Sequence, residues 1–154
     1  MEINNRTVRL LSQTNNFTDE NLWSFFEENF DLKLKSKQFL LKNKFILLDY
    51  NIINALKNND VKEGDKIKVK TISKVLESKN DNFKIGEYIL GTGCVQDYYI
   101  SDGENCEKFD IDKLNYSENE IFIGLENFNK AFERLIELED EKKIILKTQF
   151  KPSI

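Results

Sequence analysis

Residues 66–109 limit the folds open to this chain more than any other part of the sequence. Runs rich in Val, Ile and Tyr alternate there with polar turn clusters at residues 80–82, 91–93 and 102–104. Short segments of high strand propensity, separated by turn residues at regular spacing, are typical of small antiparallel barrels and sandwiches. The sequence therefore predicts a mainly β fold.

Composition places the chain among single globular domains. Its 154 residues match the length of one domain, and 40% of them are hydrophobic and 32% charged, a balance that supports folding. The 12 phenylalanines suit a packed core. The formal net charge of −4 gives no overall attraction to nucleic acid, so we expect no nucleic-acid partner.

The chain contains no histidine, which excludes nucleophile systems built on Ser-His-Asp or Cys-His and most zinc sites. We therefore expect no bound metal. Cys94 and Cys106 form no C-x-x-C pattern and are expected to be free thiols of a cytoplasmic protein, although their spacing leaves open whether they lie close together. No apolar run reaches about 18 residues and no signal peptide is visible, so no membrane partner is expected.

Hydrophobic spacing predicts the elements of the first half. Residues 7–11 favour a first strand, and residues 39–48 favour a longer one. Residues 22–30 fit either a helix or a strand, because their aromatic residues have helix spacing while alternate residues also share a strand face. The side chains expected on one face of the 39–48 strand are Phe39, Leu41, Phe45 and Leu47.

Similar patterns continue through the middle of the chain. Residues 52–59 favour one or two helical turns. Apolar and small residues alternate with lysines over 67–75, which predicts a strand with one wet face. Further strands are expected over 83–90 and 95–100, the second followed by a hairpin turn at 101–103.

The C-terminal part predicts a helix followed by a strand. Apolar residues recur every three or four positions over 125–138, which is typical of an amphipathic helix, and Asn127 is its expected N-cap. A polar loop at 139–141 then leads to an alternating strand at 143–150, which Pro152 follows.

Several of these segments resemble the N-terminal domain of NADP-dependent medium-chain reductases, in the prostaglandin/leukotriene (alkenal/one, curcumin) reductase branch. The similar motifs are Thr-Ile-Ser-Lys-Val-Leu-Glu-Ser at 71–78, Ile-Gly-Glu-Tyr-Ile-Leu-Gly at 85–91 and Gln-Asp-Tyr-Tyr-Ile-Ser-Asp-Gly at 96–103. Gly-Leu-Glu-Asn at 124–127 resembles the C-terminal end of the same domain. The resemblance implies a GroES-like, partly open β-barrel with a C-terminal helix and closing strand, and it favours a strand over residues 22–30.

The resemblance also implies a missing part. The barrel part, residues 1–114, is joined through 115–120 directly to the helix and strand of 121–154, where the family inserts its nucleotide-binding Rossmann domain. We therefore expect a single domain, 1–154, with no bound cofactor, although the family uses NADP. Met1 and the continuous join favour natural loss of the nucleotide-binding domain.

Positions matching the family's cleft motifs are the candidate site. The candidate cleft-lining residues are Asp49, Tyr50, Asn51, Lys70, Gln96, Asp97 and Tyr98. The motifs also depart from the family, because Val69-Lys70 replaces paired glycines and Val95 replaces a tryptophan. No residue is assigned a catalytic role.

Taken together, these observations predict an oxidoreductase-like, stand-alone GroES-like domain that is not catalytic by itself and has a binding or interaction role. Its partner is unknown, and self-association is an open alternative. A second hypothesis is the substrate side of an NADP-dependent reductase, completed by a separate nucleotide-binding chain. A third is a barrel that binds a small ligand at its mouth.

Overall fold

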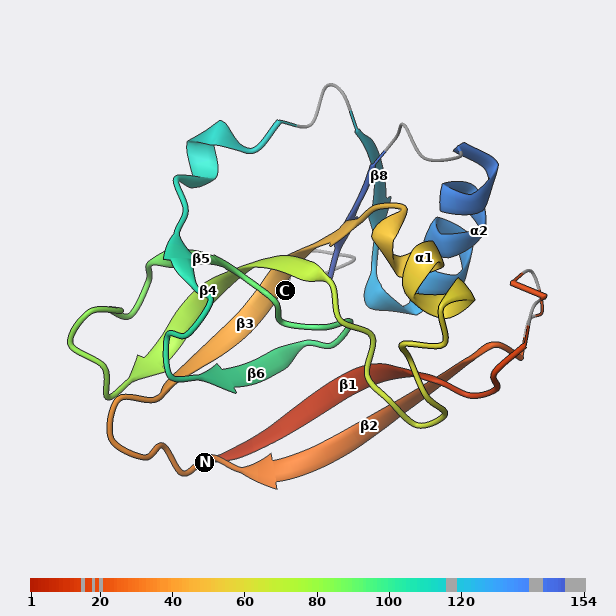
Figure 1. Ribbon diagram of the computed structural model, residues 1–154. Coiled ribbons are helices and arrows are strands. Elements are labelled where there is room, and N and C mark those ends of the chain that lie inside the picture. The colour runs from red at the N-terminus through yellow and green to blue at the C-terminus, as the bar shows by residue number, and fades with distance from the viewer. Residues whose placement is uncertain (15, 18, 20, 116–118, 139–142, 149–154) are drawn as a thin grey trace.

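The fold is assembled around one long central strand, β3 (Figure 1). The computed structural model describes residues 1–154 except 15, 18, 20, 116–118, 139–142 and 149–154. The strands are β1 (Glu2–Leu10), β2 (Trp23–Asp31), β3 (Phe39–Leu48), β4 (Lys70–Ser78), β5 (Tyr88–Gly91), β6 (Tyr98–Ser101), β7 (Glu107–Lys108), β8 (Glu120–Ile123) and β9 (Ile144–Lys147). The helices are α1 (Asn51–Lys57) and α2 (Phe128–Leu138), with 3₁₀ turns η1 (Ile111–Lys113) and η2 (Leu125–Asn127).

The main sheet curls around β3. One edge of β3 pairs with β4, and the other pairs first with β6 along Phe39–Lys42 and then with β9 along Phe45–Leu48. The strand order is β7-β5-β4-β3-β9-β8, with β6 paired to β3 beside this path. β7 and β8 end the order without pairing with each other, so the barrel is partly open and the predicted mainly β, GroES-like architecture is confirmed.

One strand pair departs from the predicted antiparallel arrangement. β8 and β9 run parallel, with Glu120 opposite Ile144 and Ile123 opposite Lys147. Parallel neighbours need a long crossover, and α2 supplies it between these two strands. The helix was predicted from its spacing, whereas the β8 strand before it was not.

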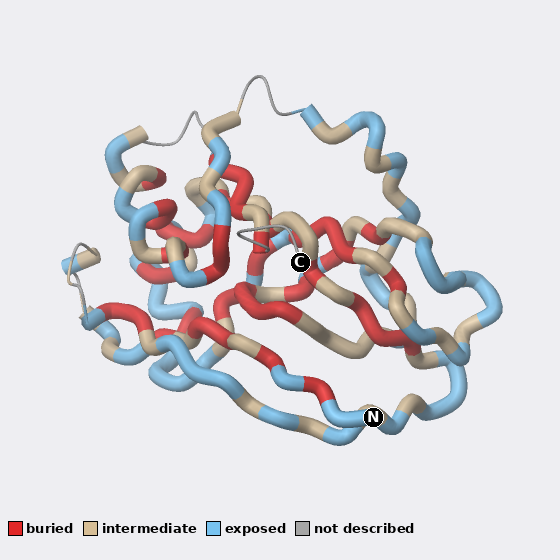
Figure 2. The backbone as a smooth tube through the Cα atoms, turned by 180° about the vertical axis from the view of Figure 1, so that it is seen from behind, coloured by how far each residue is buried: buried red, intermediate tan, exposed pale blue. Residues whose placement is uncertain are grey.

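β1 and β2 form a separate antiparallel ribbon. The register joins Glu2 to Asp31 and Leu10 to Trp23, which settles residues 22–30 as a strand. β1 starts five residues before the predicted strand because its polar first half pairs with the end of β2. Figure 2 shows β2 exposed along most of its length, while β1 alternates between buried and exposed residues.

The predicted inner face of β3 is only half right. Two bulges interrupt its pairing with β4, one between Leu40 and Leu41 and one between Asn43 and Phe45. An extra residue reverses the side-chain alternation, so Phe39 and Leu41 are buried whereas Phe45 and Leu47 are only partly buried. The bounds of β3 agree with the prediction.

Two other predicted strands are shorter than expected, for local reasons. Residues 83–87 form turns in which Gly86 has a φ of 93°, so β5 begins only at Tyr88. Gln96 forms an isolated bridge with Thr7 of β1 instead of continuing the pairing with β3, and β6 begins at Tyr98. Hydrophobic periodicity reports neither the turn at Gly86 nor the bridge of Gln96 to β1.

Two apolar cores lie at opposite ends of the barrel. The larger core packs α1 and α2 side by side against the barrel, and Trp23 contacts Phe128 and Phe132 edge to face, with ring centroids 5.1 and 5.0 Å apart. The smaller core is built from Phe39, Leu41, Val75 and Ile89.

The expected cap of α2 has a different role. Asn127 directly precedes α2, but its side-chain amide donates to the Ile123 carbonyl instead of accepting from the helix. The predicted loop at 139–141, the end of the predicted closing strand and Pro152 lie outside the described residues.

Candidate functional site

The seven predicted cleft residues fall into two groups along β3. Asp49, Tyr50 and Asn51 follow the end of β3, and Lys70 pairs with Leu47 at the same end of the sheet. Gln96, Asp97 and Tyr98 lie beside the first half of β3, where Tyr98 is opposite Lys42. The two groups flank different halves of one strand. That all seven residues line a single cleft therefore stays a prediction.

The group after β3 makes local contacts. The Asp49 carboxylate accepts from the Asn51 backbone N–H at 3.0 Å, which turns the chain into α1. The Lys57 ammonium donates to the Tyr50 hydroxyl at 3.3 Å. Lys70 is exposed and lines a hollow described below.

Asp97 is held by two cations in a largely buried position. Its side chain is 5% exposed and accepts from Arg6 Nε at 2.7 Å and Arg6 Nη2 at 3.0 Å, with Lys42 Nζ at 3.4 Å. The hydrogen bonds that Arg6 donates to Asp97 raise the pKa of Arg6 above its ordinary value, so the guanidinium stays charged. Arg6 also donates to the Thr148 carbonyl at 3.1 Å, so this group ties β1 to the centre of the barrel.

A buried polar layer separates the two apolar cores. Asn43 and Ser73 face each other across β3 and β4, and Thr71 follows on β4. All three are fully buried, and Gln96, 5% exposed, joins them. The Asn43 amide donates to the carbonyls of Gln96 at 2.8 Å and Gly93 at 3.1 Å, while Ser73 donates to Asn43 Oδ1. The polar layer therefore fixes the irregular segment before β6 against the central strands.

Gly91 and Gly93 are required because the side chains of this layer and of Tyr99 lie close to their backbone. The sequence did not reveal this reason. A Cβ on Gly93 would overlap Asn43 Oδ1, Thr71 Oγ1 and the Tyr99 ring, and one on Gly91 would come within 2.9 Å of Tyr99 Oη. The Gly93 N–H donates to Thr71 Oγ1 at 2.9 Å. Both glycines leave room for Tyr99 to extend across the barrel.

Tyr99 is the functional candidate that sequence reasoning missed. Its hydroxyl is buried and forms no hydrogen bond in the described part of the chain. Burial raises the pKa of Tyr99 to about 12, and the nearby hydroxyls of Ser73 and Thr71 oppose this only in part. Such an unpaired buried hydroxyl is rare and costly. The available signal was strand alternation, because an outward Tyr98 implies an inward Tyr99.

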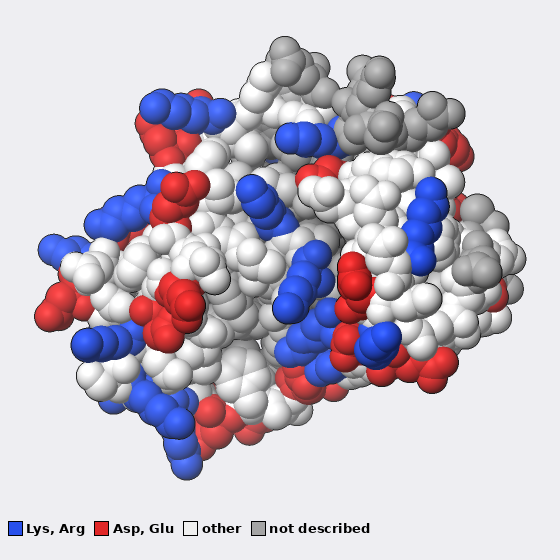
Figure 3. All heavy atoms as spheres, viewed as in Figure 1, with Lys and Arg blue, Asp and Glu red and all other residues white. Residues whose placement is uncertain are grey.

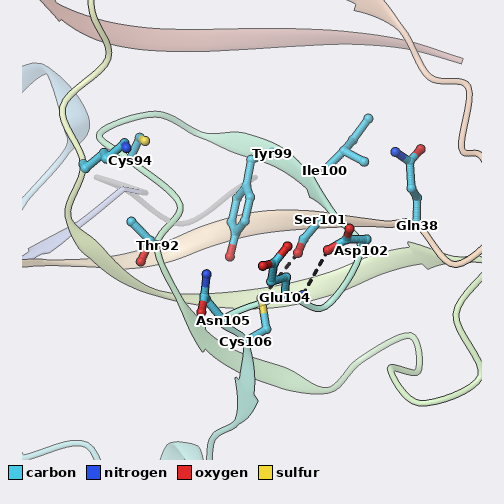
Figure 4. Close-up of a pocket in the computed structure, with 11 residues that line it drawn as sticks. Gln38, Thr92, Cys94, Tyr99, Ile100, Ser101, Asp102, Glu104, Asn105 and Cys106 are labelled. Carbon is cyan, nitrogen blue, oxygen red and sulfur yellow. Dashed lines mark hydrogen bonds between the residues drawn. The ribbon is translucent and has the colours of Figure 1, made fainter.

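A cavity of about 610 Å³ opens beside Tyr99 (Figure 4). Figure 4 shows the Tyr99 ring crossing it, with the hydroxyl directed towards Asn105 and Cys106. A hollow of about 490 Å³, which Lys70 also lines, shares Thr92, Asn105 and Cys106 with it. The larger cavity is lined by Gln38, Lys68, Thr92, Cys94, Tyr99, Ile100, Ser101, Asp102, Glu104, Asn105 and Cys106. A wall that mixes polar and apolar surface in this way suits a small molecule with polar groups.

Both cysteines line this cavity as free thiols. Burial raises the pKa of the Cys94 thiol, which makes it a poor nucleophile at neutral pH. The described residues contain no group of three His, Cys, Asp or Glu side chains placed to hold a metal ion. Nor is any helix in the described ranges long and apolar enough to cross a membrane.

Comparison with known proteins identifies the family. Residues 6–109 match the family described as the N-terminal domain of oxidoreductase. The chain belongs to this family. The N-terminal oxidoreductase domain thus covers the second half of β1 and all elements from β2 to β7, and the resemblance inferred from the motifs is confirmed. No curated protein matches the chain in a sequence search.

Solved structures share the fold of this N-terminal oxidoreductase domain. CurA from Vibrio vulnificus is 21% identical with a TM-score of 0.61, over 68% of this chain and 31% of CurA. Its complex with NADPH is 22% identical with a TM-score of 0.59, over 73% and 33%. The human synaptic vesicle membrane protein VAT-1 homolog-like protein is 12% identical with a TM-score of 0.54, over 84% and 52%. The chain therefore spans about a third of the length of CurA.

Proposed function

We propose that this chain works as a stand-alone GroES-like domain that binds a ligand or partner and does not by itself transfer hydride. The observation that carries the proposal is the join between η1 and β8. Six residues, 114–119, separate Lys113 from Glu120, and the chain then closes through α2 and β9 onto β3. In the reductases that the sequence resembles, a nucleotide-binding domain occupies this position, and hydride transfer needs a fold that holds the cofactor.

The altered cleft motifs support the same proposal. Val69, in the place of a family glycine, is 8% exposed and packs in the larger core. Lys70, in the place of the second glycine, has an exposed side chain. Paired glycines at these positions would let a ligand come close to the backbone, and the Lys70 side chain prevents this. Asp97, which matches the family, is committed to Arg6 and Lys42. The remaining surface is therefore poorly suited to a nicotinamide ring.

The test measures nicotinamide chemistry with the purified chain alone. NADPH is titrated while its fluorescence emission is followed, and an enone is then added while NADPH absorbance is recorded. We expect unchanged emission and no NADPH oxidation up to about 1 mM cofactor, the concentration range of weak binding. An emission change that saturates at micromolar NADPH, or enone-dependent oxidation, would refute the proposal, because both require the nicotinamide to sit in a protected site.

The small-ligand barrel is a second candidate, favoured by the unpaired hydroxyl of Tyr99 beside the 610 Å³ cavity. A ligand that supplies a hydrogen-bond acceptor would satisfy this hydroxyl. A fragment library, screened by ligand-observed NMR against the chain and its Tyr99→Phe variant, tests it. Carbonyl or hydroxyl fragments that bind only the unaltered chain would support this function, and the absence of such hits would reject it. The reductase completed by a separate chain stays a prediction.

A further inference from the structure

Four side chains form a row across four neighbouring strands of the barrel. Tyr98 on β6 is the Cα partner of Lys42 on β3, Lys42 is the partner of Lys74 on β4, and Lys74 is the partner of Tyr88 on β5. Neighbouring strands lie about 4.8 Å apart, so the row spans roughly 14 Å. We call these four residues the tyrosine–lysine row.

The row lies on the outer face of the barrel. Ser73 and Val75, on either side of Lys74, are buried inside, and successive side chains of a strand point to opposite faces. Lys42 and Lys74 are therefore outward neighbours, directly opposite each other across β3 and β4. Like charges in directly opposite positions destabilise a sheet.

Lys44 adds a third positive charge beside the row, from the second bulge of β3. In the described part of the chain, neither its ammonium nor that of Lys74 forms an ion pair with a carboxylate. Burial lowers the pKa of Lys44, and the charges of Lys42 and Lys74 lower it further. The three lysines are therefore close enough to repel one another.

The carboxylate nearest to the row compensates little of this charge. Asp97 lies 3.4 Å from Lys42 Nζ but 2.7 Å from Arg6 Nε, which it binds through both oxygens. Asp97 and the exposed Glu126 thus pair with Arg6 and Lys42, and in the described part of the chain neither forms an ion pair with Lys44 or Lys74. An uncompensated cluster of this kind is a natural site for an anion.

The tyrosines hold two ammonium groups at defined places. Lys42 Nζ lies 4.5 Å from the centroid of the Tyr98 ring, and Lys74 Nζ lies 6.0 Å from that of Tyr88. Cation–π contacts of this kind keep the lysine side chains on the sheet between the two rings. The middle of the row therefore offers fixed positive charge, and its ends offer aromatic surface.

We propose that the tyrosine–lysine row binds a free nucleotide, with its phosphates between the lysines and its base against a tyrosine. Ammonium groups bind phosphates as point charges, and tyrosine rings contact flat bases. The net charge of −4 and the 14 Å span fit one nucleotide better than a strand of nucleic acid. This proposal does not rest on the proposed function. NADPH bound at the row would be held only by its phosphates, so its nicotinamide emission would stay unchanged and the two tests would give separate answers.

Calorimetry with the full chain tests the phosphate requirement, using inorganic pyrophosphate, ADP and adenosine as probes. We expect pyrophosphate to bind with a Kd near about 1 mM, ADP to bind more tightly, and adenosine not to bind. Added salt should weaken the binding of pyrophosphate and ADP, because the contacts are electrostatic.

Variants then locate the site. The double variant Lys44→Gln and Lys74→Gln, whose ammonium groups have no carboxylate partner to lose, should weaken pyrophosphate binding roughly tenfold or more. Tyr88→Leu should weaken ADP binding more than pyrophosphate binding, because it removes the ring proposed to contact the base, whereas pyrophosphate loses only the contact that positions Lys74. The matched control is Lys57→Gln, because Lys57 Nζ lies 5.3 Å from the Tyr50 ring on α1, a lysine–tyrosine pair outside the row.

Four results would overturn the proposal. Neither pyrophosphate nor ADP binds at about 10 mM, a limit well above the expected Kd. Adenosine binds as tightly as ADP. Lys57→Gln weakens binding as much as the double variant. A single-stranded oligonucleotide binds where ADP and pyrophosphate do not, which would assign the row to nucleic acid instead.

Discussion

Removing the hydroxyl of Tyr99 should stabilise the protein. This hydroxyl is buried, and no described residue accepts its proton or donates to its oxygen. The nearby Ser73 hydroxyl donates its proton to Asn43 and the Thr71 hydroxyl accepts from the Gly93 N–H, and neither is placed to form a hydrogen bond with Tyr99 Oη. A tyrosine whose hydroxyl forms a hydrogen bond would lose stability on truncation, so the sign of the effect is diagnostic.

The magnitude follows from two opposing contributions. An unpaired buried hydroxyl costs about 1–3 kcal/mol relative to an apolar group of the same shape. Deleting one oxygen leaves a void of about 10 Å³, which costs only about 0.2 kcal/mol at the usual dependence on cavity volume. Tyr99→Phe should therefore raise the free energy of unfolding by about 1–2 kcal/mol. For a domain of this size that corresponds to a Tm increase of roughly 3–6 °C.

Urea unfolding of the chain and of Tyr99→Phe, followed by circular dichroism, measures this difference. Tyr50→Phe is the matched control, since its hydroxyl accepts from Lys57 on the exposed surface of α1 and should matter by less than about 0.5 kcal/mol. A loss of about 1 kcal/mol or more in Tyr99→Phe would refute the reasoning. It would mean that the Tyr99 hydroxyl has a partner in solution.

The remaining predictions concern charge and proton binding. The Tyr99 pKa of about 12 lies above the value of about 10 in unfolded chains. The folded chain therefore holds the phenol proton more tightly than the unfolded chain. The stability linked to this proton is fully present below pH 10 and is lost as the pH rises through 12. Unfolding experiments across this range should show the loss, and Tyr99→Phe should lack it. Asp97→Asn should lower the free energy of unfolding in urea by about 3 kcal/mol, because it leaves Arg6 without its closest partner. The control Glu126→Gln removes an exposed partner of Arg6 and should cost under about 0.5 kcal/mol. Cys94 should react with iodoacetamide several-fold more slowly in the folded chain than in urea, since burial raises its pKa; equal rates by mass spectrometry would contradict this.

The sequence predicted best the bounds of the apolar strand β3 and the inward face of β4. β3 agrees with its predicted bounds, and the alternation over 67–75 correctly placed Thr71 and Ser73 on the inward face with Val75. That same pattern already contained the polar layer, because two hydroxyl residues occupied positions that the alternation assigns to a core. Hydroxyl residues at the inward positions of an alternating strand thus indicate a buried polar layer.

Features that depend on left-handed residues and distant pairing could not be predicted. The turn at Gly86 shortened one strand and the bridge of Gln96 to Thr7 shortened another, and nothing in the spacing signals either feature or the positive φ of Cys94. The unpaired hydroxyl of Tyr99 depends on which residues of β4 and β5 meet it, a tertiary fact. The tyrosine–lysine row likewise requires the register of four strands, whereas the sequence shows only scattered lysines.

Matching family residues need not indicate an intact cleft, and Gln96-Asp97 shows why. Gln96 Oε1 accepts from the buried Asn5 amide at 3.0 Å, and Asp97 binds Arg6, so each side chain ties β1 to the segment before β6. The backbone does the same, since the Asp97 N–H donates to the Arg6 carbonyl at 3.0 Å. Because β1 pairs only with β2 among the named strands, this attachment helps to hold the β1–β2 ribbon on the barrel, together with the backbone bonds of Val8 and Leu10. The motif therefore has a structural task that remains even where no nucleotide-binding domain faces it.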